Sequence, residues 1–144
     1  MNNDEFSRQA VVQEAMSWLR TPYHHAARVK GAGVDCLMLL AGVYTAVGLI
    51  APPEIPYYPQ DVMFHRGEET YLAGLMRYAH EVVHPHPGDV AIWKIGRIFS
   101  HAAIVTQWPE IIHAYRPEGQ VTRGLGNSGD LADRQVKFYS LWGK

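Results

Sequence analysis

The sequence predicts one α+β domain in which helices come first and an antiparallel sheet follows. Apolar residues recur at helical spacing in the first part of the chain, whereas short runs of period two, separated by turn residues, fill the part after about residue 88. Helices and strands do not alternate, which argues against βαβ units. The chain has 144 residues and no repeat or linker divides it, so residues 1–144 are predicted to form a single domain.

Three helices are expected. An amphipathic helix covers about residues 5–20, and Pro22 ends it because proline disfavours a helical residue before it. A second helix over 35–47 is apolar nearly all round, with Gly48 placed to cap its end, so it should be central and buried. The spacing also predicts a shorter helix over 69–80.

Five strands are expected after the turn that ends at Gly88. They cover residues 89–95, 99–106, 110–115, 120–123 and 135–141.

Composition excludes several classes of function. Thirteen Lys and Arg against 14 Asp and Glu give a net charge of -1, which is too balanced for the basic surface that nucleic-acid binding needs. No apolar run approaches the roughly 20 residues that span a bilayer, so membrane insertion is not expected. The N-terminus is acidic where a signal peptide would be basic, which predicts synthesis in the cytoplasm without an export signal.

The chain has a single cysteine, Cys36, which excludes an intramolecular disulfide. It falls in the first turn of the predicted 35–47 helix, where unpaired backbone amides and the helix dipole favour an anion. Such a position lowers the pKa of a thiol, and the same amides can stabilise an oxyanion. A nucleophile is therefore one interpretation of Cys36, and a buried, inert cysteine is the other.

A cysteine nucleophile needs a base, and the base needs a group that orients it. Of the eight histidines, His101 and His113 are the two that fall inside predicted strands. In an antiparallel hairpin the numbers of opposed residues have a constant sum; a sum of 216 pairs Ala103 with His113, and 214 pairs His101 with His113 directly. Any even sum puts both rings on one face, whereas an odd sum separates them. Two scattered strand histidines with separate partners are the alternative.

Five segments match, in order and spacing, the NlpC-type cysteine peptidases that cut bacterial cell-wall peptides, and the resemblance runs from about Ala10 to Trp142. The segments are Thr21-Pro22-Tyr23-His24-His25, Gly31-Ala32-Gly33-Val34-Asp35-Cys36, Pro87-Gly88-Asp89-Val90, His101-Ala102-Ala103-Ile104-Val105 and Ile112-His113-Ala114. The first segment and the short length resemble most closely the branch found in phages and prophages, where it is associated with tail assembly.

The resemblance implies a papain-like α+β fold, in which the helix that begins at the cysteine packs on an antiparallel sheet. It makes Cys36 the nucleophile, His101 the general base and acid, and His113 the third, orienting residue. It also implies that the hydroxyl of Tyr23 lies beside the thiol and that Asp35 helps to hold the free amine of the substrate. Core packing of Tyr23 and helix capping by Asp35 are the alternatives from the residues themselves. No cofactor or metal is implied.

The activity that the resemblance implies is cleavage of peptidoglycan stem peptides, usually between D-glutamate and diaminopimelate. It further implies phage-tail proteins as partners and delivery to the cell wall within a virion tail. One departure is Leu37-Met38, where relatives commonly have Ser-Gly after the cysteine. That departure leaves open a catalytically inactive structural or wall-binding component of a tail. A zinc site made of Cys36, His101 and His113, and an acyltransferase or thioesterase, are further alternatives.

Overall fold

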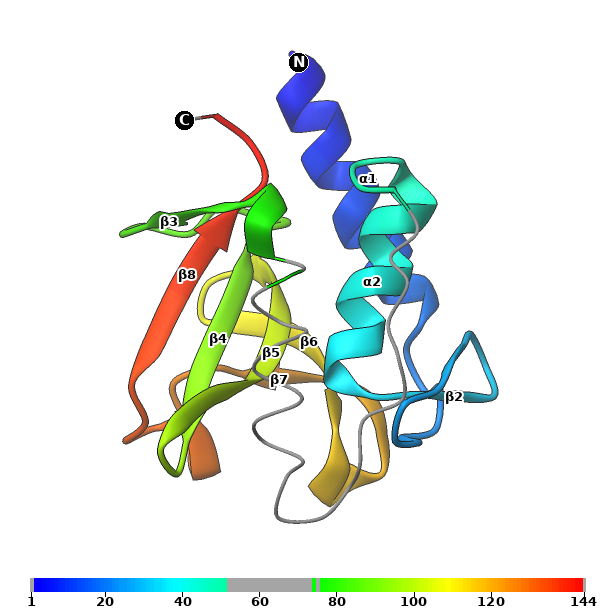
Figure 1. Ribbon diagram of the computed structural model, residues 1–144, viewed down its shortest axis with the longest axis vertical. Coiled ribbons are helices and arrows are strands. Elements are labelled where there is room, and N and C mark those ends of the chain that lie inside the picture. The colour runs from blue at the N-terminus through cyan, green and yellow to red at the C-terminus, as the bar shows by residue number, and fades with distance from the viewer. Residues whose placement is uncertain (1, 52–73, 75, 144) are drawn as a thin grey trace.

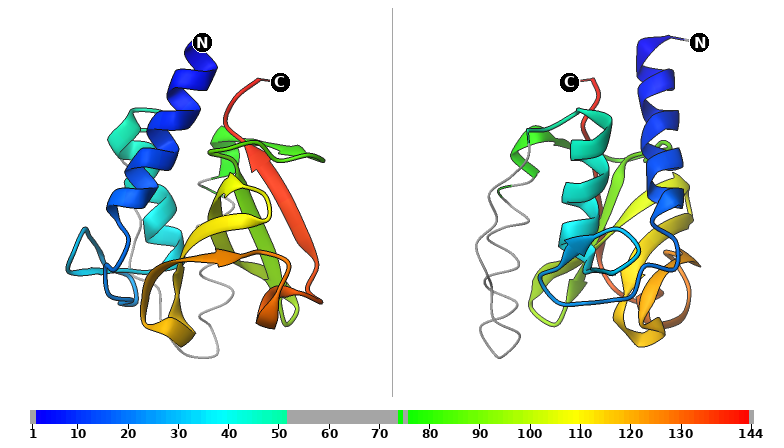
Figure 2. Two further views of the ribbon diagram at one scale, coloured as in Figure 1. Left: turned by 180° about the vertical axis from the view of Figure 1, so that it is seen from behind. Right: turned by 90° about the vertical axis from the view of Figure 1, so that its right-hand side faces the viewer.

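A computed structural model describes residues 2–51, 74 and 76–143. Two α-helices lie side by side along one face of a six-stranded antiparallel sheet (Figures 1 and 2). The helices are α1 (Asn3–Ser17) and α2 (Cys36–Val47), and the strands of the sheet are β3 (His80–Val82), β4 (Val90–Ile95), β5 (Ile98–Gln107), β6 (Glu110–Tyr115), β7 (Gln120–Leu125) and β8 (Val136–Ser140). Their order across the sheet is β3-β8-β4-β5-β6-β7, and every pair is antiparallel. The predicted α+β class is confirmed.

Both long helices occur close to where the sequence predicts them. In α1 the side chain of Asn2 accepts a hydrogen bond from the amide of Glu5 at 2.8 Å and so caps the first turn. The helix ends at Ser17, before the predicted residue 20, because the chain tightens into i→i+3 hydrogen bonds and Arg20 takes a left-handed φ of 74°. None of the described helices is long and apolar enough to cross a membrane.

Helix α2 begins at Cys36 because Asp35 caps it: the Asp35 carboxylate accepts from the amide of Met38 at 2.9 Å. Gly48 ends the helix in the left-handed conformation, with φ of 85°, as the sequence predicts. The helix packs on β5 and β6, and it is largely buried. Near its C-terminal end the Tyr44 hydroxyl donates to the carbonyl of Gly88 at 2.6 Å, which ties α2 to the segment that leads into β4.

The predicted helix over residues 69–80 is only partly present where the structure describes it: Gly74 is α-helical, but the helix does not continue to residue 80. Residues Met76–Tyr78 form a single 3-10 turn, and His80 opens strand β3, which pairs with β8. The hydrogen bonds offered by β8, which lies far away in the sequence, outweigh the local helical spacing. Residues 69–73 and 75 of that prediction lie outside the described residues.

The sheet has an apolar core on each face. One set of alternating residues packs against the two helices, and the other set forms a second, smaller core with Leu131. The helix-side set from the strands is Val90, Ile92, Ala102, Ile104, Ile112, Ala114 and Val121, and the opposite set is Ala91, Trp93, Ala103, Val105 and Ile111. By period two, His101 and His113 belong to the second set.

The register of the hairpin formed by β5 and β6 has the even sum that puts His101 and His113 on one face. Ile104 lies opposite Ile112 and Val105 opposite Ile111, so the opposed numbers sum to 216. The register shifts only next to the turn, where Gln107 lies opposite Glu110. The even sum places both histidines on the same face of the sheet.

Besides the main sheet, two short strands form a hairpin just before α2. Strand β1 (Arg28–Val29) pairs with β2 (Gly33–Val34), and Tyr23 makes an isolated parallel bridge to Val34. This hairpin was not predicted from the sequence. It leads the chain into Cys36, the first residue of α2.

Candidate functional site

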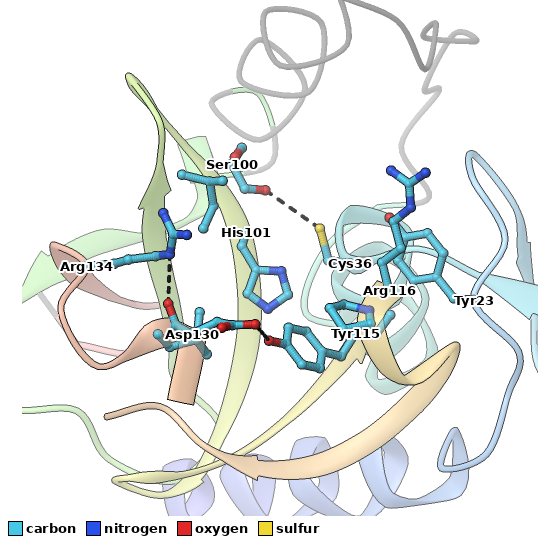
Figure 3. Close-up of a pocket in the computed structure, with 12 residues that line it drawn as sticks. Tyr23, Cys36, Ser100, His101, Tyr115, Arg116, Asp130 and Arg134 are labelled. Atoms are coloured by element: carbon cyan, nitrogen blue, oxygen red, sulfur yellow. Dashed lines mark hydrogen bonds between the residues drawn. The ribbon is translucent and has the colours of Figure 1, made fainter. Parts of the chain in front are cut away.

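A pocket of about 250 Å³ lies where the first turn of α2 meets strands β5 and β6 (Figure 3). It combines a thiol, an imidazole, two guanidinium groups and a carboxylate with apolar walls. The lining residues are Tyr23, Cys36, Ile95, Ser100, His101, Ala114, Tyr115, Arg116, Pro117, Asp130, Leu131 and Arg134. Two of the three predicted catalytic residues, Cys36 and His101, therefore meet in one pocket.

Cys36 is the first residue of α2, and only 4% of it is exposed. Its Sγ lies 3.6 Å from the carbonyl oxygen of Ser100, to which the thiol donates. Ser100 sits at an irregularity of the sheet: Trp93 lies opposite His101 while Lys94 lies opposite Phe99, so the pairing with β4 skips Ser100. Such a bulge redirects the backbone of one strand. Here the redirected carbonyl meets the thiol, one residue before His101.

The imidazole of His101 is surrounded by aromatic rings but keeps one side open to the pocket. Its ring centroid lies 5.5 Å from that of Trp93 and 5.8 Å from that of Tyr115. Its Nε2 atom is 2.8 Å from Nδ1 of His113. In Figure 3 the ring lies between β5 and Cys36, with its other nitrogen on the side that faces Cys36.

His113 lies behind His101 and is almost fully buried, with 3% of the residue exposed. The ring of Tyr115 stacks on it at 4.5 Å between centroids and 14° between planes. On β7, Gly124 leaves the room that the imidazole occupies, since a Cβ there would lie 3.1 Å from Nε2 of His113. The expected contact between the two histidines is thus present in the structure.

Burial makes both imidazoles weak bases. Burial lowers the pKa of His101 to about 3, with smaller contributions from His113 and Arg134, and burial lowers the pKa of His113 to about 4. Both rings are therefore neutral at pH 7. In a neutral pair one ring donates and the other accepts, so a proton on Nε2 of His101, donated to His113, leaves Nδ1 of His101 free to accept a proton.

These pKa shifts predict that acid destabilises the fold. Unfolded imidazoles take up protons near pH 6.5, whereas the folded ones do so only near 3 and 4, so the unfolded state binds more protons below pH 6.5. We expect the free energy of unfolding to fall by about 5 kcal/mol between pH 7 and pH 4.5, since each of the two histidines contributes about 1.4 kcal/mol per pH unit below 6.5. Urea denaturation at a series of pH values measures this change.

The matched variants for that measurement are the double substitution His101→Gln with His113→Gln, and His84→Gln, which alters an exposed histidine. In the double variant the free energy of unfolding should depend less steeply on pH, and in His84→Gln its dependence on pH should be that of the parent. An equally steep loss of stability in the double variant would show that other groups cause it.

Tyr23 and Asp35 occupy different environments. Tyr23 lines the pocket, and its amide donates to the carbonyl of Gly119 at 2.8 Å. Asp35 is 2% exposed and is not among the pocket-lining residues; one carboxylate oxygen accepts from the amide of Met38 at 2.9 Å and the other from Ala26 at 2.7 Å. Helix capping, one of the two interpretations of Asp35, is present, and the role of either residue in binding substrate stays a prediction.

The Leu37-Met38 departure falls in the core and not in the pocket. Leu37 is 1% exposed and Met38 is 6% exposed, and both belong to the apolar cluster between the helices and the sheet. Neither side chain is among those that line the pocket. Leu37 and Met38 therefore contribute to the core and not to the described walls of the pocket.

Sequence reasoning did not nominate several residues of the pocket. The Tyr115 hydroxyl donates to the carboxylate of Asp130 at 3.1 Å, and Nε of Arg134 donates to the backbone carbonyl of Asp130 at 2.8 Å. Burial raises the pKa of Tyr115, and the hydrogen bond to Asp130 adds to that rise. Period two, which puts residue 115 on the same face as His113, was a signal that could have found the tyrosine.

Metal ligands do not gather in the described part of the chain: it holds no group of three or more His, Cys, Asp or Glu side chains that could hold an ion.

Comparison with known proteins shows which fold this is. No family model matches the sequence, and no curated protein does. Solved structures do: the NlpC/P60 domain of peptidoglycan hydrolase SagA aligns with a TM-score of 0.59 and 20% identity, over 90% of this chain and 96% of that one. Peptidoglycan hydrolase RipB from Mycobacterium tuberculosis aligns with a TM-score of 0.66 and 16% identity, over 99% of this chain and 68% of that one.

A third structure, NlpC2 from Trichomonas vaginalis, aligns with a TM-score of 0.67 and 14% identity over 96% of this chain. This chain spans 47% of that protein and 39% of an NlpC/P60 family protein from Bacillus cereus. At such low identities the likeness is one of fold. The chain has the papain-like α+β fold of NlpC/P60 domains, as expected from the five sequence segments.

Proposed function

We propose that the protein is a cysteine endopeptidase that hydrolyses amide bonds in peptidoglycan stem peptides. One observation carries the proposal: the single cysteine begins α2 in a pocket that it shares with His101, and His101 is hydrogen-bonded to His113 at 2.8 Å. This is a nucleophile, a base and an orienting group in the order that nucleophilic catalysis requires. The fold in which it occurs is also that of SagA and RipB, which are peptidoglycan hydrolases.

The proposed reaction begins with proton transfer from the Cys36 thiol to Nδ1 of His101, which is free to accept because Nε2 donates to His113. The thiolate attacks the carbonyl of the substrate amide. The backbone N–H groups at the N-terminus of α2 stabilise the negative charge that develops on the carbonyl oxygen. His101 then returns the proton to the leaving amine, and the acyl group stays on sulfur. Water, deprotonated by His101, releases the acid and regenerates the thiol.

The low pKa of His101, about 3, defines its role in this scheme. At pH 7 the resting imidazole is neutral. His101 therefore acts as a general base during attack, and the base is present in its active form throughout the physiological pH range.

The bond between D-glutamate and diaminopimelate is the proposed target, on the strength of the sequence resemblance. Purified peptidoglycan incubated with the protein should release fragments whose masses place the new amine on diaminopimelate and the new carboxylate on D-glutamate. Mass spectrometry of the soluble products checks this. Products that end at another bond would contradict the specificity but leave the peptidase, and the absence of products would contradict both.

Association with a phage tail is proposed on the same resemblance, with synthesis in the cytoplasm and delivery within the virion. Purified, nuclease-treated virions test this. The protein should be detected in them, at a fixed ratio to the tail proteins. A protein found only in the lysate and absent from particles would contradict it.

Gly124 tests whether the position of His113 matters for catalysis. A Cβ at residue 124 would lie 3.1 Å from Nε2 of His113, so Gly124→Ala should shift the ring and weaken its hold on His101. We expect kcat to fall about tenfold, with KM unchanged, because no substrate contact is altered. Steady-state kinetics on a synthetic stem peptide measures both constants.

His113→Asn supplies the control, because its shorter side chain does not reach the added methyl group. In that background Gly124→Ala should cause no further loss of kcat. Equal losses in the two backgrounds would show that Gly124 acts by another route.

A further inference from the structure

The pocket carries two guanidinium groups, one on each side of the cysteine and histidine. In Figure 3 Arg134 lies beyond His101, and Arg116 lies beyond Cys36 in the opposite direction. Both arginines are exposed. Within the described residues neither of them forms an ion pair with a carboxylate.

Among the described lining residues there is one carboxylate, Asp130, and it offsets only one of the two positive charges without forming an ion pair with either arginine. Asp130 uses its carboxylate to accept from Tyr115, and Arg134 donates Nε to the backbone carbonyl of Asp130 instead. That bond holds the Arg134 side chain, while its two terminal nitrogens make no hydrogen bond to a described residue. The described walls of the pocket therefore carry an excess of positive charge next to the thiol. After burial and His113, the charge of Arg134 also contributes to the lowered pKa of His101.

The chemistry of acyl transfer determines what each arginine would meet. The acyl residue of the substrate becomes bonded to Cys36, and His101 hands its proton to the leaving amine. The leaving residue must therefore pass over His101, toward Arg134. The acyl residue lies on the side of Cys36 that faces Arg116.

Resting on the proposed peptidase function, we infer that Arg116 and Arg134 bind free carboxylates on the two residues that flank the scissile bond. Arg116 binds the carboxylate of the acyl residue, and Arg134 binds that of the leaving residue. Guanidinium groups suit this task because their planar donors match a carboxylate. The substrate class is then a peptide that is anionic on both sides of the cleaved bond, and amidation of either carboxylate weakens recognition.

Four synthetic peptides of one sequence test this inference: free or amidated at the acyl residue, combined with free or amidated at the leaving residue. For the unaltered protein each amidation should lower kcat/KM about tenfold. Arg116→Gln should lose sensitivity to amidation of the acyl residue only, and Arg134→Gln to amidation of the leaving residue only. Arg123→Gln, which alters an exposed arginine of β7 outside this pocket, is the matched control and should keep both sensitivities.

The outcomes separate this inference from the proposed function. Cleavage of all four peptides at equal rates, or an unchanged tenfold preference in both arginine variants, overturns the inference and leaves the peptidase intact. Exchanged sensitivities overturn the assignment of sides. If no peptide is cleaved, the proposed function fails, and calorimetric binding of the same peptides to Cys36→Ala still decides: equal affinities for free and amidated peptides overturn carboxylate binding, and tenfold weaker binding of each amidated peptide supports it.

Discussion

Replacement of Cys36 by Ala abolishes the release of soluble fragments from purified peptidoglycan, with an expected loss in rate of about 10⁴-fold or more. The reason is chemical: no other cysteine exists in the chain, and no other described side chain of the pocket is a sulfur nucleophile. Chromatography of the released fragments, followed by mass spectrometry, measures the effect.

Cys36→Ser is the matched control for folding, because it preserves the shape of the side chain. Both variants should unfold within a few degrees of the parent, since the thiol makes one weak hydrogen bond, to the Ser100 carbonyl at 3.6 Å. Unchanged fragment release by Cys36→Ala would contradict the assignment of the nucleophile. Absence of release by the parent protein itself would favour the inactive structural or wall-binding component of a tail.

His101→Ala should cost nearly as much, about 10³-fold or more in kcat, because His101 both accepts the thiol proton and returns it to the leaving amine. His113→Ala should lower kcat less, by about 10- to 100-fold, since His113 acts through His101 and not on the substrate. Steady-state kinetics on a synthetic stem peptide compares the two. The exposed His84→Ala is the control, and a His101→Ala variant that keeps more than a tenth of the parent rate would contradict the role of His101.

Local signals predicted the part of the fold that positions the nucleophile. Asp35 before the apolar run and Gly48 after it are strong helix boundaries, so the observed α2 starts one residue from the prediction. For His101 and His113 the residue pattern supplied only the condition for their meeting, an even sum of opposed residue numbers across one hairpin, and the observed sum of 216 meets that condition. Both features depend only on neighbouring parts of the chain.

Non-local pairing explains what the sequence did not reveal. The predicted 69–80 helix failed at His80 because β8, about 60 residues later, offers it a partner. The bulge at Ser100, which presents a carbonyl to the thiol, arises from a mismatch between β4 and β5 that no residue type marks. Arg134 and Asp130 reach the pocket from a turn between strands, and their place depends on how the whole sheet curves around them.

The alkylation rate of Cys36 by iodoacetamide, measured from pH 5 to pH 7, tests the activation of the thiol by His101 most directly. A thiolate with a protonated imidazole has the same number of protons as a thiol with a neutral imidazole. The population of the reactive form therefore does not change with pH as long as His101 is neutral at rest, which its pKa of about 3 ensures. The account predicts a nearly constant rate for the parent protein and, for His101→Ala, a rate that falls about tenfold for each pH unit. A tenfold fall per unit in the parent as well would show that the thiol ionises on its own, and would contradict the account.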